Sequence, residues 1–484
     1  MRLLENIAPQ ELWKYFEEIA QIPRPSKKEE KIRAYLLRFA AEHQLEVLTD
    51  EVGNVLIKKA ASAGASDAKT VILQSHMDMV CEKNADKVFD FDCDPISLVL
   101  DGEWLKADGT TLGADNGIGM AASLAVLASK EIQHGALECL FTVDEETGLT
   151  GAFALQEGFV SGEILLNLDS EDDGEIFIGC AGGVDTLASL PISFEAVPVG
   201  SFAMQFEVGG LLGGHSGDDI NKERGNAIKI LARFLDAVAA DYGLRVVDFE
   251  GGNLRNAIAR EARAIAVVSQ SLKEQVVAEF NIFSAELAEE YQYTDGGLTF
   301  RHQSVNVPER VLSVDSQRKL LGLILACPHG VLAMSSRMAG MVETSTNLAS
   351  VKMEGNNALF TTSQRSEVDS RKWAAAQMVR SVFDLAGAQV SCSDGYPGWT
   401  PNPQSYIADV SAKSYESLFG VRPAIKSIHA GLECGLFLQK YPQLDMVSIG
   451  PTIRNPHSPD ERIHLQHTEK FWLHLLDILR VVAS

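Results

Sequence analysis

The sequence predicts an α/β fold with an α+β domain inserted into it. Short apolar strand candidates end repeatedly in polar residues, and amphipathic helix candidates separate them. The pattern of strand and helix candidates changes near residue 184, and a stretch rich in Gly and Pro, typical of turns, follows at 393–403. Alternating strands and helices are typical of α/β sheets, whose ligands bind at the carboxyl edge of the strands. We therefore expect one discontinuous domain from residues 1–183 and 394–484, and an inserted domain from residues 184–393.

The elements before the insert follow from periodicity. Two amphipathic helices are expected at about 9–20 and 27–42, the second opened by Ser26 and Glu29 as a capping box. The run 71–75 begins with Val, Ile and Leu and loses the polar alternation of a half-exposed strand, as a parallel strand buried on both faces does. Further strands are expected within 45–56 and at 137–143 and 164–168, with a helix at about 120–129.

Inside the insert, strands and helices alternate in a βαβ-like order that occurs twice, which favours two similar α+β halves. Strands are expected at 202–208, 262–268 and 358–363, and helices at 226–240, 311–326 and 371–386. After the turn-dense return, we expect a helix at 406–419, a strand at 446–449 and a final amphipathic helix at 468–482.

The composition is that of a globular, acidic protein. Of 484 residues, 46% are hydrophobic and 22% are charged, and the formal net charge is -24. This charge, without a basic patch, argues against nucleic acid or an anionic membrane as a partner. The seven cysteines are widely spaced and form no Cys-x-x-Cys pair, so neither a disulfide framework nor a thiolate zinc site is expected. No secretory h-region and no run of ~18 apolar residues is present, so we expect a cytoplasmic protein.

Polar side chains lie in the segments that follow four of the strand candidates, and one further carboxylate lies in a loop before a helix. They are His76 and Asp78 after 71–75, Glu145 and Glu146 after 137–143, Asp169 after 164–168, His457 in the loop after 446–449, and Asp115 before the helix. Since strand exits share one sheet edge, these groups are expected to gather there. Two imidazoles and three carboxylates suit a pair of divalent ions such as zinc, manganese or cobalt.

Two further roles follow from position. Asp78 is expected to accept the ring N–H of His76 and so fix its tautomer. Glu145 and Glu146 would point different ways along an extended chain, so that one can bind metal while the other serves as a general base.

The glycine-rich stretch 109–120 raises the alternative of a nucleotide loop. Its spacing is not Gly-x-Gly-x-x-Gly, no Gly-Lys-Ser/Thr follows, and Asp115 would repel a phosphate. Nucleotide binding is therefore disfavoured, although a non-catalytic metal- or nucleotide-binding protein stays open as a second hypothesis.

Several motifs resemble those of the M20 metallopeptidase family. They are His76-Met77-Asp78, Thr111-Leu112-Gly113-Ala114-Asp115-Asn116-Gly117, Asp144-Glu145-Glu146-Thr147-Gly148, Asn167-Leu168-Asp169-Ser170, Gly213-Gly214-His215-Ser216-Gly217 and Pro456-His457-Ser458-Pro459. The resemblance covers essentially the whole chain. It implies a zinc-peptidase-like mixed sheet flanked by helices, an inserted α+β lid domain, and a homodimer formed through the lid.

The resemblance also implies roles for individual residues. His76 and Asp169 would hold one zinc ion, Glu146 and His457 the other, and Asp115 would bridge them; Asp78 would orient His76, and Glu145 would be the base for a hydroxide between the metals. In the lid, His215 would stabilise an oxyanion, while Asn256 and Arg365 would clamp the free carboxylate of the substrate. On the sequence alone, His215 fits a turn-capping residue and Arg365 a surface cation.

The implied function is a dizinc dipeptidase that hydrolyses small unblocked dipeptides, including Xaa-His dipeptides such as β-alanyl-histidine. An aminoacylase or deacylase of the same family would use the same metal set and differ only in its pocket. Hydrolysis of Ala-His against that of an N-acetyl amino acid separates the two.

Overall fold

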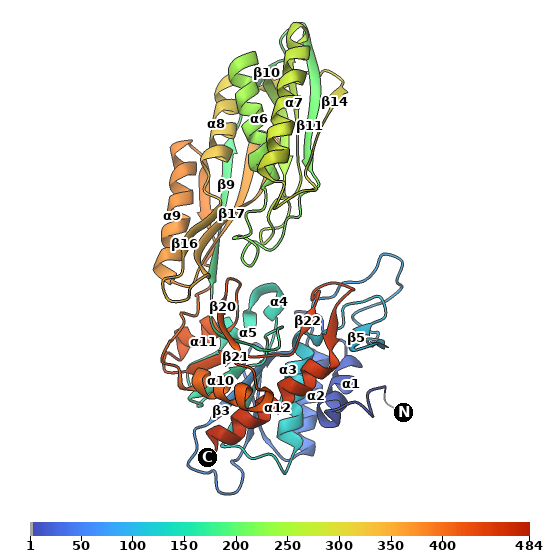
Figure 1. The fold of residues 1–484 in the computed structure, drawn as a ribbon, viewed down its shortest axis with the longest axis vertical. Helices are drawn as coiled ribbons and strands as arrows, with labels where there is room; N and C mark the ends of the chain where they lie inside the picture. The colour runs from blue at the N-terminus through green and yellow to red at the C-terminus, as the bar shows by residue number, and fades with distance from the viewer. Residues whose placement is uncertain (1–2) are drawn as a thin grey trace. The chain divides into compact units, whose positions relative to one another are not determined.

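The computed structural model describes residues 3–484 and divides the chain into two compact units (Figure 1). The first unit runs from the amino terminus to Cys180 and includes Trp399–Ser427 and Leu432–Ser484, and the second comprises Ala181–Gly398 and Ile428–Gly431. The sequence did not indicate that residues 428–431 join the second unit. They do so because the amide of Ala181 donates to the carbonyls of Ile428 (3.0 Å) and Ala430 (3.1 Å).

An eight-stranded mixed sheet forms the centre of the first unit, as the predicted fold class requires. In spatial order its strands are β1 (Glu46–Thr49), β2 (Val55–Lys59), β6 (Leu137–Thr142), β3 (Val71–His76), β7 (Ile164–Asn167), β21 (Asp445–Ser448), β8 (Glu175–Cys180) and β20 (Ala424–Ile428). The neighbours β6, β3, β7 and β21 are parallel, whereas β1, β2 and β8 pair antiparallel. The four parallel strands therefore end at the same edge of the sheet.

Helices flank this sheet, and a smaller four-stranded sheet completes the unit. The helices are α1 (Gln10–Ala20), α2 (Glu30–Glu42), α3 (Ala114–Ala128), α4 (Glu145–Gly148), α5 (Thr150–Ala154), α10 (Tyr406–Phe419), α11 (Cys434–Lys440) and α12 (Leu465–Val482). The small sheet has the order β22 (Ile453–Arg454), β23 (Arg462–His464), β5 (Trp104–Ala107) and β4 (Leu98–Asp101). Helix α3 packs on β3 and on α1. Its backbone is non-helical at Asp115 and Asn116, so the regular helix begins at Gly117, close to the predicted start near residue 120.

The capping box expected at Ser26 and Glu29 is wrong. The Ser26 hydroxyl donates to the Asp78 carboxylate (2.8 Å), and Glu29 accepts from the amides of Lys27 (2.8 Å) and Asp144 (3.0 Å). Helix α2 begins at Glu30 without a side-chain cap. Ser26 bonds a distant partner, and Glu29 bonds both a distant amide and that of Lys27 rather than the amide of Ser26.

The second unit contains a nine-stranded sheet. Its order is β14 (Thr299–Val305), β11 (Ser201–Gly209), β13 (Ala262–Ser269), β12 (Arg245–Gly251), β17 (Val342–Glu354), β18 (Asn357–Ser366), β9 (Gly182–Pro191) and β19 (Gln389–Cys392), with β16 (Gly330–Met334) beside β17. Helices α6 (Ala227–Tyr242), α7 (Lys273–Glu290), α8 (Val314–Ala326) and α9 (Asp369–Leu385) lie along this sheet (Figure 1). The core between them includes Phe206, Phe234 and Phe360.

One helix of the second unit begins later than predicted. The helix expected from residue 311 begins only at Val314, because Arg310–Leu312 forms strand β15, which pairs with β10 (Phe194–Ala196). A short 3-10 turn, η1 (Gln270–Leu272), precedes α7. The similarity of two α+β halves stays a prediction.

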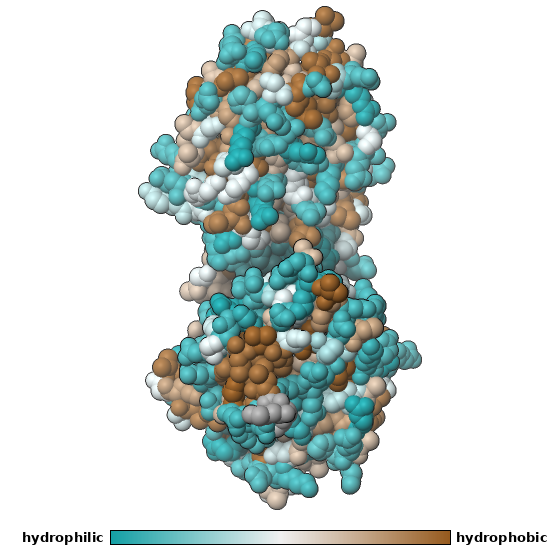
Figure 2. Space-filling model, turned by 90° about the vertical axis from the view of Figure 1, so that its right-hand side faces the viewer, coloured by the Kyte–Doolittle hydropathy of each residue, from teal (hydrophilic) through white to brown (hydrophobic). Residues whose placement is uncertain are grey.

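The surface is mainly polar. Figure 2 shows one face on which hydrophilic residues predominate, with hydrophobic residues scattered between them and gathered in one larger patch. Within residues 3–484, no helix is both long and apolar enough to cross a bilayer.

The burial of β3 gives a testable prediction. Leu73 is 0% exposed in β3, whereas Leu48 in β1 is 39% exposed. Leu73→Ala should lower the free energy of unfolding by ~2–5 kcal/mol, because it removes buried contacts and leaves a cavity. The control Leu48→Ala should change it by no more than about 0.5 kcal/mol. Urea unfolding followed by circular dichroism measures both, and equal destabilisation by the two variants would contradict the burial of β3.

Candidate metal centre

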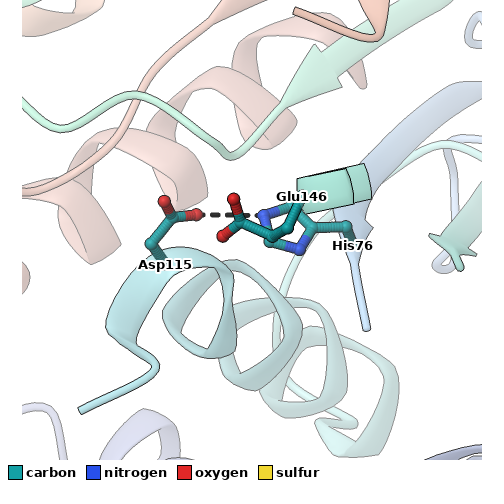
Figure 3. A group of neighbouring side chains, drawn as sticks. All are labelled: His76, Asp115 and Glu146. Atoms are coloured by element: carbon teal, nitrogen blue, oxygen red, sulfur yellow. Dashed lines mark hydrogen bonds and ion pairs between the residues drawn. The ribbon is translucent and has the colours of Figure 1, made fainter. Parts of the chain in front are cut away.

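Three of the predicted ligands meet at the carboxyl edge of the first sheet. His76 ends β3, Glu146 lies in α4 directly after β6, and Asp115 lies in the first turn of α3; their side chains point toward one another (Figure 3). One ligand atom from each residue lies within 4.8 Å of the other two. The Nε2 atom of His76 is 2.9 Å from Oδ1 of Asp115.

Asp169 and His457 complete the group. Oδ1 of Asp169 lies 3.4 Å from Nε2 of His76, on the side of β7. Nε2 of His457 lies 3.2 Å from Oδ2 of Asp115 and 3.1 Å from Oε2 of Glu146. The structure thus brings all five predicted ligands together, and the two carboxylate oxygens of Asp115 face the two different histidines.

Asp78 connects two strand exits. Its carboxylate, which is fully buried, accepts from the Ser26 hydroxyl and from the amides of Glu145 (3.0 Å) and Glu146 (3.2 Å). Nδ1 of His76 lies 3.4 Å from this carboxylate and 3.2 Å from the Asp78 carbonyl. Asp78 therefore holds the start of α4 against the end of β3, and its Oδ1 and its carbonyl oxygen both lie near Nδ1 of His76.

The extended backbone predicted for Glu145 and Glu146 is wrong, although their side chains do point in different directions. Asp144 has a left-handed φ of 49°, and the two glutamates begin helix α4 instead of continuing the strand. Successive residues of a helix are rotated by about 100°, so the two side chains still point in different directions. Burial raises the pKa of Glu145 well above its usual value, and the neighbouring Glu146 adds to this shift while His76 opposes it.

The electrostatics of the group favour a cation. Burial, together with the charge of Asp115, raises the pKa of Glu146 to about 7 and also raises the pKa of Asp169. Burial alone would lower the pKa of His457, but hydrogen bonds to Asp115 and Glu146 raise it to about 11. The shifts thus have two causes, burial of the carboxyl groups and the closeness of several carboxylates to one another.

The donor set fits divalent metal ions. It offers imidazole nitrogens and carboxylate oxygens without thiolates, which suits zinc, cobalt or manganese. In addition, Oε1 of Glu146 is buried and has no hydrogen-bond partner among the described residues. Such an oxygen is available as a ligand atom.

Two residues around the group have no role at the metal centre on the sequence alone, which offers Glu433 only as a possible pocket wall. The Asn116 side chain donates to the Leu168 carbonyl (3.0 Å) and to the Asp169 carboxylate, so it holds that ligand in place. Glu433, which is 0% exposed, accepts from Gln74 (2.5 Å) and Thr142 (2.8 Å) below the site, and burial raises its pKa to about 8. Nothing in the local sequence marks these contacts, because their partners lie on other strands.

The acidic residues that follow Ser170 are half-buried and have partners. Burial and the charge of Asp115 raise the pKa of Glu171 well above its usual value. Asp173 accepts from the Tyr415 hydroxyl (3.0 Å) and pairs with Lys470 (3.2 Å).

The loop that precedes α3 already has an anion at its amide groups. The amides of Leu112 (2.7 Å), Gly113 (2.9 Å) and Ala114 (2.7 Å) donate to the Glu461 carboxylate. Free amides at a helix start are what a phosphate group would need. Their occupation by Glu461 argues against the nucleotide-binding hypothesis.

The three residues predicted to act from the insert lie together in the second unit. Nδ1 of His215 accepts from the amides of Gly217 (3.3 Å) and Asp218 (3.2 Å), so this residue does cap a turn. The amide of Ser216 donates to the Asn256 carbonyl (2.8 Å), and Nε of Arg365 donates to the Ser216 hydroxyl (3.3 Å). Arg365 is only 7% exposed, which excludes a surface cation. The Asn256 residue itself is exposed.

Comparison with known proteins extends these observations to the whole chain. The model of a family described as Peptidase family M20/M25/M40 matches residues 72–479, which include every residue of the metal centre. The chain is 44% identical to the cytosol non-specific dipeptidase of Escherichia coli (strain K12) over 484 residues, which is 100% of both chains.

Solved structures agree with this assignment. The aminoacylhistidine dipeptidase from Vibrio alginolyticus is 44% identical, with a TM-score of 0.89 over 99% of this chain and 98% of that one. A tripeptidase from Staphylococcus aureus, 17% identical, shares the fold with a TM-score of 0.58 over 99% of both chains. Since the family model spans most of the chain and a relative matches its full length at 44% identity, the chain belongs to peptidase family M20.

Proposed function

We propose that the protein is a dipeptidase that works with two divalent metal ions, zinc in the first place, with cobalt or manganese as alternatives. The observation that supports this most is the position of Asp115, whose two oxygens face His76 at 2.9 Å and His457 at 3.2 Å. The full-length relatives at 44% identity that are called dipeptidases support the substrate class.

The residues divide into two ligand groups. His76 and Asp169 would hold one ion, Glu146 and His457 the other, and Asp115 would bridge them. When bound, such a pair of ions supplies Lewis acidity that polarises the peptide carbonyl and makes water nucleophilic at neutral pH.

Glu145 is the proton carrier in this proposal. It would take a proton from the attacking water and pass it to the leaving amine. A general base is most effective when its pKa is close to the working pH, and burial raises the pKa of Glu145 in that direction. Asp78 supports this role by holding the amide of Glu145 at 3.0 Å.

His215 is suited to donate a hydrogen bond to the oxyanion. Because its Nδ1 accepts from two amides, a neutral ring carries its proton on Nε2. Nη2 of Arg365 lies 3.5 Å from that nitrogen, so the two groups are neighbours. An anionic oxygen would satisfy both.

Arg365 and Asn256 would bind the free carboxylate of the substrate. A guanidinium fork suits a carboxylate, and Arg365 is held in place by the Tyr396 hydroxyl (2.9 Å) and by Ser216. A longer peptide would place an amide where this clamp expects a charge, which would restrict the enzyme to dipeptides. Xaa-His substrates such as β-alanyl-histidine, a cytoplasmic location and a homodimer formed through the second unit, here the lid, are further parts of the proposal.

Glu145→Gln tests the assignment of the base. Turnover of Ala-His should fall by ~10²–10⁴ while the metal content stays that of the parent, because the amide cannot carry the proton but leaves the ligands intact. Steady-state kinetics and inductively coupled plasma mass spectrometry measure the two quantities. The matched variant Glu146→Gln should lose metal as well as activity, and loss of metal from Glu145→Gln would contradict the assignment.

Arg365→Met tests the carboxylate clamp. The parent should prefer Ala-His to its C-terminal amide, and the variant should lose ~10–100-fold in kcat/KM on the free acid alone, since a charge-assisted hydrogen bond contributes ~1.5–3 kcal/mol. Arg380→Met, on the exposed part of α9, serves as the control. Unchanged discrimination between acid and amide in Arg365→Met would exclude the clamp.

A substrate comparison separates dipeptidase from deacylase. Metal-loaded protein should hydrolyse Ala-His and leave N-acetyl-alanine intact, because the proposal requires an unblocked dipeptide. Release of acetate without hydrolysis of Ala-His would favour the aminoacylase alternative, and hydrolysis of neither would favour a binding protein.

A further inference from the structure

Two buried charged residues, Arg24 and Glu461, hold the loop that carries Asp115. They are 3% and 2% exposed, respectively. Neither forms a hydrogen bond to the side chain of a proposed ligand; among the described residues, the hydrogen-bond partners of both are backbone groups. Burying a charge in this way is costly unless hydrogen bonds compensate it, and both residues have several.

Arg24 joins this loop to the exit of β3. Its Nη1 donates to the carbonyls of Met77 (3.0 Å) and Asp78 (2.6 Å), the two residues after His76. Its Nη2 donates to the carbonyl of Gly113 (2.5 Å), two residues before Asp115. A single rigid guanidinium thus fixes the segment of His76 relative to the segment of Asp115.

Glu461 joins the same loop to the segment of His457. It lies in the connection between β22 and β23 that also contains His457. Its Oε2 accepts from the amides of Leu112 and Gly113, and its Oε1 accepts from that of Ala114. A carboxylate at the start of a helix gains from these otherwise unpaired amides and from the helix dipole.

The glycines of the loop make room for this arrangement. A Cβ atom on Gly113, whose φ is +68°, would lie 2.5 Å from Nη2 of Arg24 and 2.8 Å from the sulfur of Met79. A Cβ atom on Gly117 would lie 2.8 Å from the same nitrogen. Any side chain at these positions would displace the guanidinium.

We propose that Arg24 and Glu461 are positioning residues that separately set the two halves of the metal centre. Arg24 fixes Asp115 relative to His76, and Glu461 fixes Asp115 relative to His457. This inference rests on the proposed function, because it concerns the metal ions that the five ligands would hold. A purely structural role would stabilise the fold without favouring either half.

The test measures metal binding by each half of the centre separately, in full-length protein from which metal has been removed. The background Glu146→Gln retains the half of His76 and Asp169, and the background Asp169→Asn retains the half of Glu146 and His457. The dissociation constant of Co²⁺ is determined by calorimetry in each background, and the visible absorption band of bound Co²⁺ reports its coordination.

Arg24→Met should weaken Co²⁺ binding ~10–100-fold in the Glu146→Gln background and shift the absorption band, as loss of a residue that orients ligands does. In the Asp169→Asn background the loss should be clearly smaller, because there Arg24 acts only through Asp115 and not also through the segment of His76. Glu461→Gln should show the reverse pattern. Arg24→Lys, which keeps the charge but not the fork, should give a smaller loss than Arg24→Met.

Two substitutions at exposed positions serve as controls for this test. Arg38→Met and Asp460→Asn, both at exposed positions, should bind Co²⁺ like their backgrounds. Thermal unfolding of the metal-free variants shows whether they fold. If Arg24→Met does not fold, Arg24→Lys replaces it in the binding measurements. Equal losses in both backgrounds, or no loss in either, would overturn the separate roles. If the parent protein itself binds no Co²⁺, the proposed function fails as well.

Discussion

Mutual repulsion between buried carboxylates is the constraint on which the first unit depends. Asp115, Glu146 and Asp169 lie around two imidazoles at one sheet edge, and their crowding contributes to raising the pKa of the latter two carboxyls. Parallel pairing of β6, β3, β7 and β21 forces the strand exits together, so the fold creates the repulsion that its surroundings must then withstand. A site of this kind is most stable when cations join it.

The surrounding residues hold the ligands mainly through backbone groups and neutral side chains. Among the described residues, no lysine or arginine forms an ion pair with Asp115, Glu146 or Asp169, and the ion-pair partners of these carboxylates are histidines. The loop of Asp115 is instead fixed through its amides and a carbonyl, and Asp169 through an amide side chain. The cations that pair with these carboxylates are therefore histidines, whose protons a divalent ion can replace when it binds the same nitrogens.

The sequence predicted the mixed fold and the convergence of the ligands, because exits of parallel strands necessarily share an edge. It failed where tertiary contacts override local patterns: Ser26 bonds Asp78 rather than its own helix, and Glu145 begins a helix where an extended chain was expected. Arg24 and Glu461 could not be found from spacing, since their partners are backbone groups 53 to 89 and 346 to 349 residues away. The roles of the second unit depend on contacts with substrate, which no sequence pattern specifies.

The most direct test of the proposed centre is anomalous X-ray diffraction at the zinc edge from crystals of zinc-loaded protein. We predict two zinc peaks ~3.5–4 Å apart, with one oxygen of Asp115 on each, as in other two-metal sites. His76 and Asp169 should contact one ion, and Glu146 and His457 the other. A single ion at full zinc occupancy, or two ions that Asp115 does not bridge, would contradict the proposal.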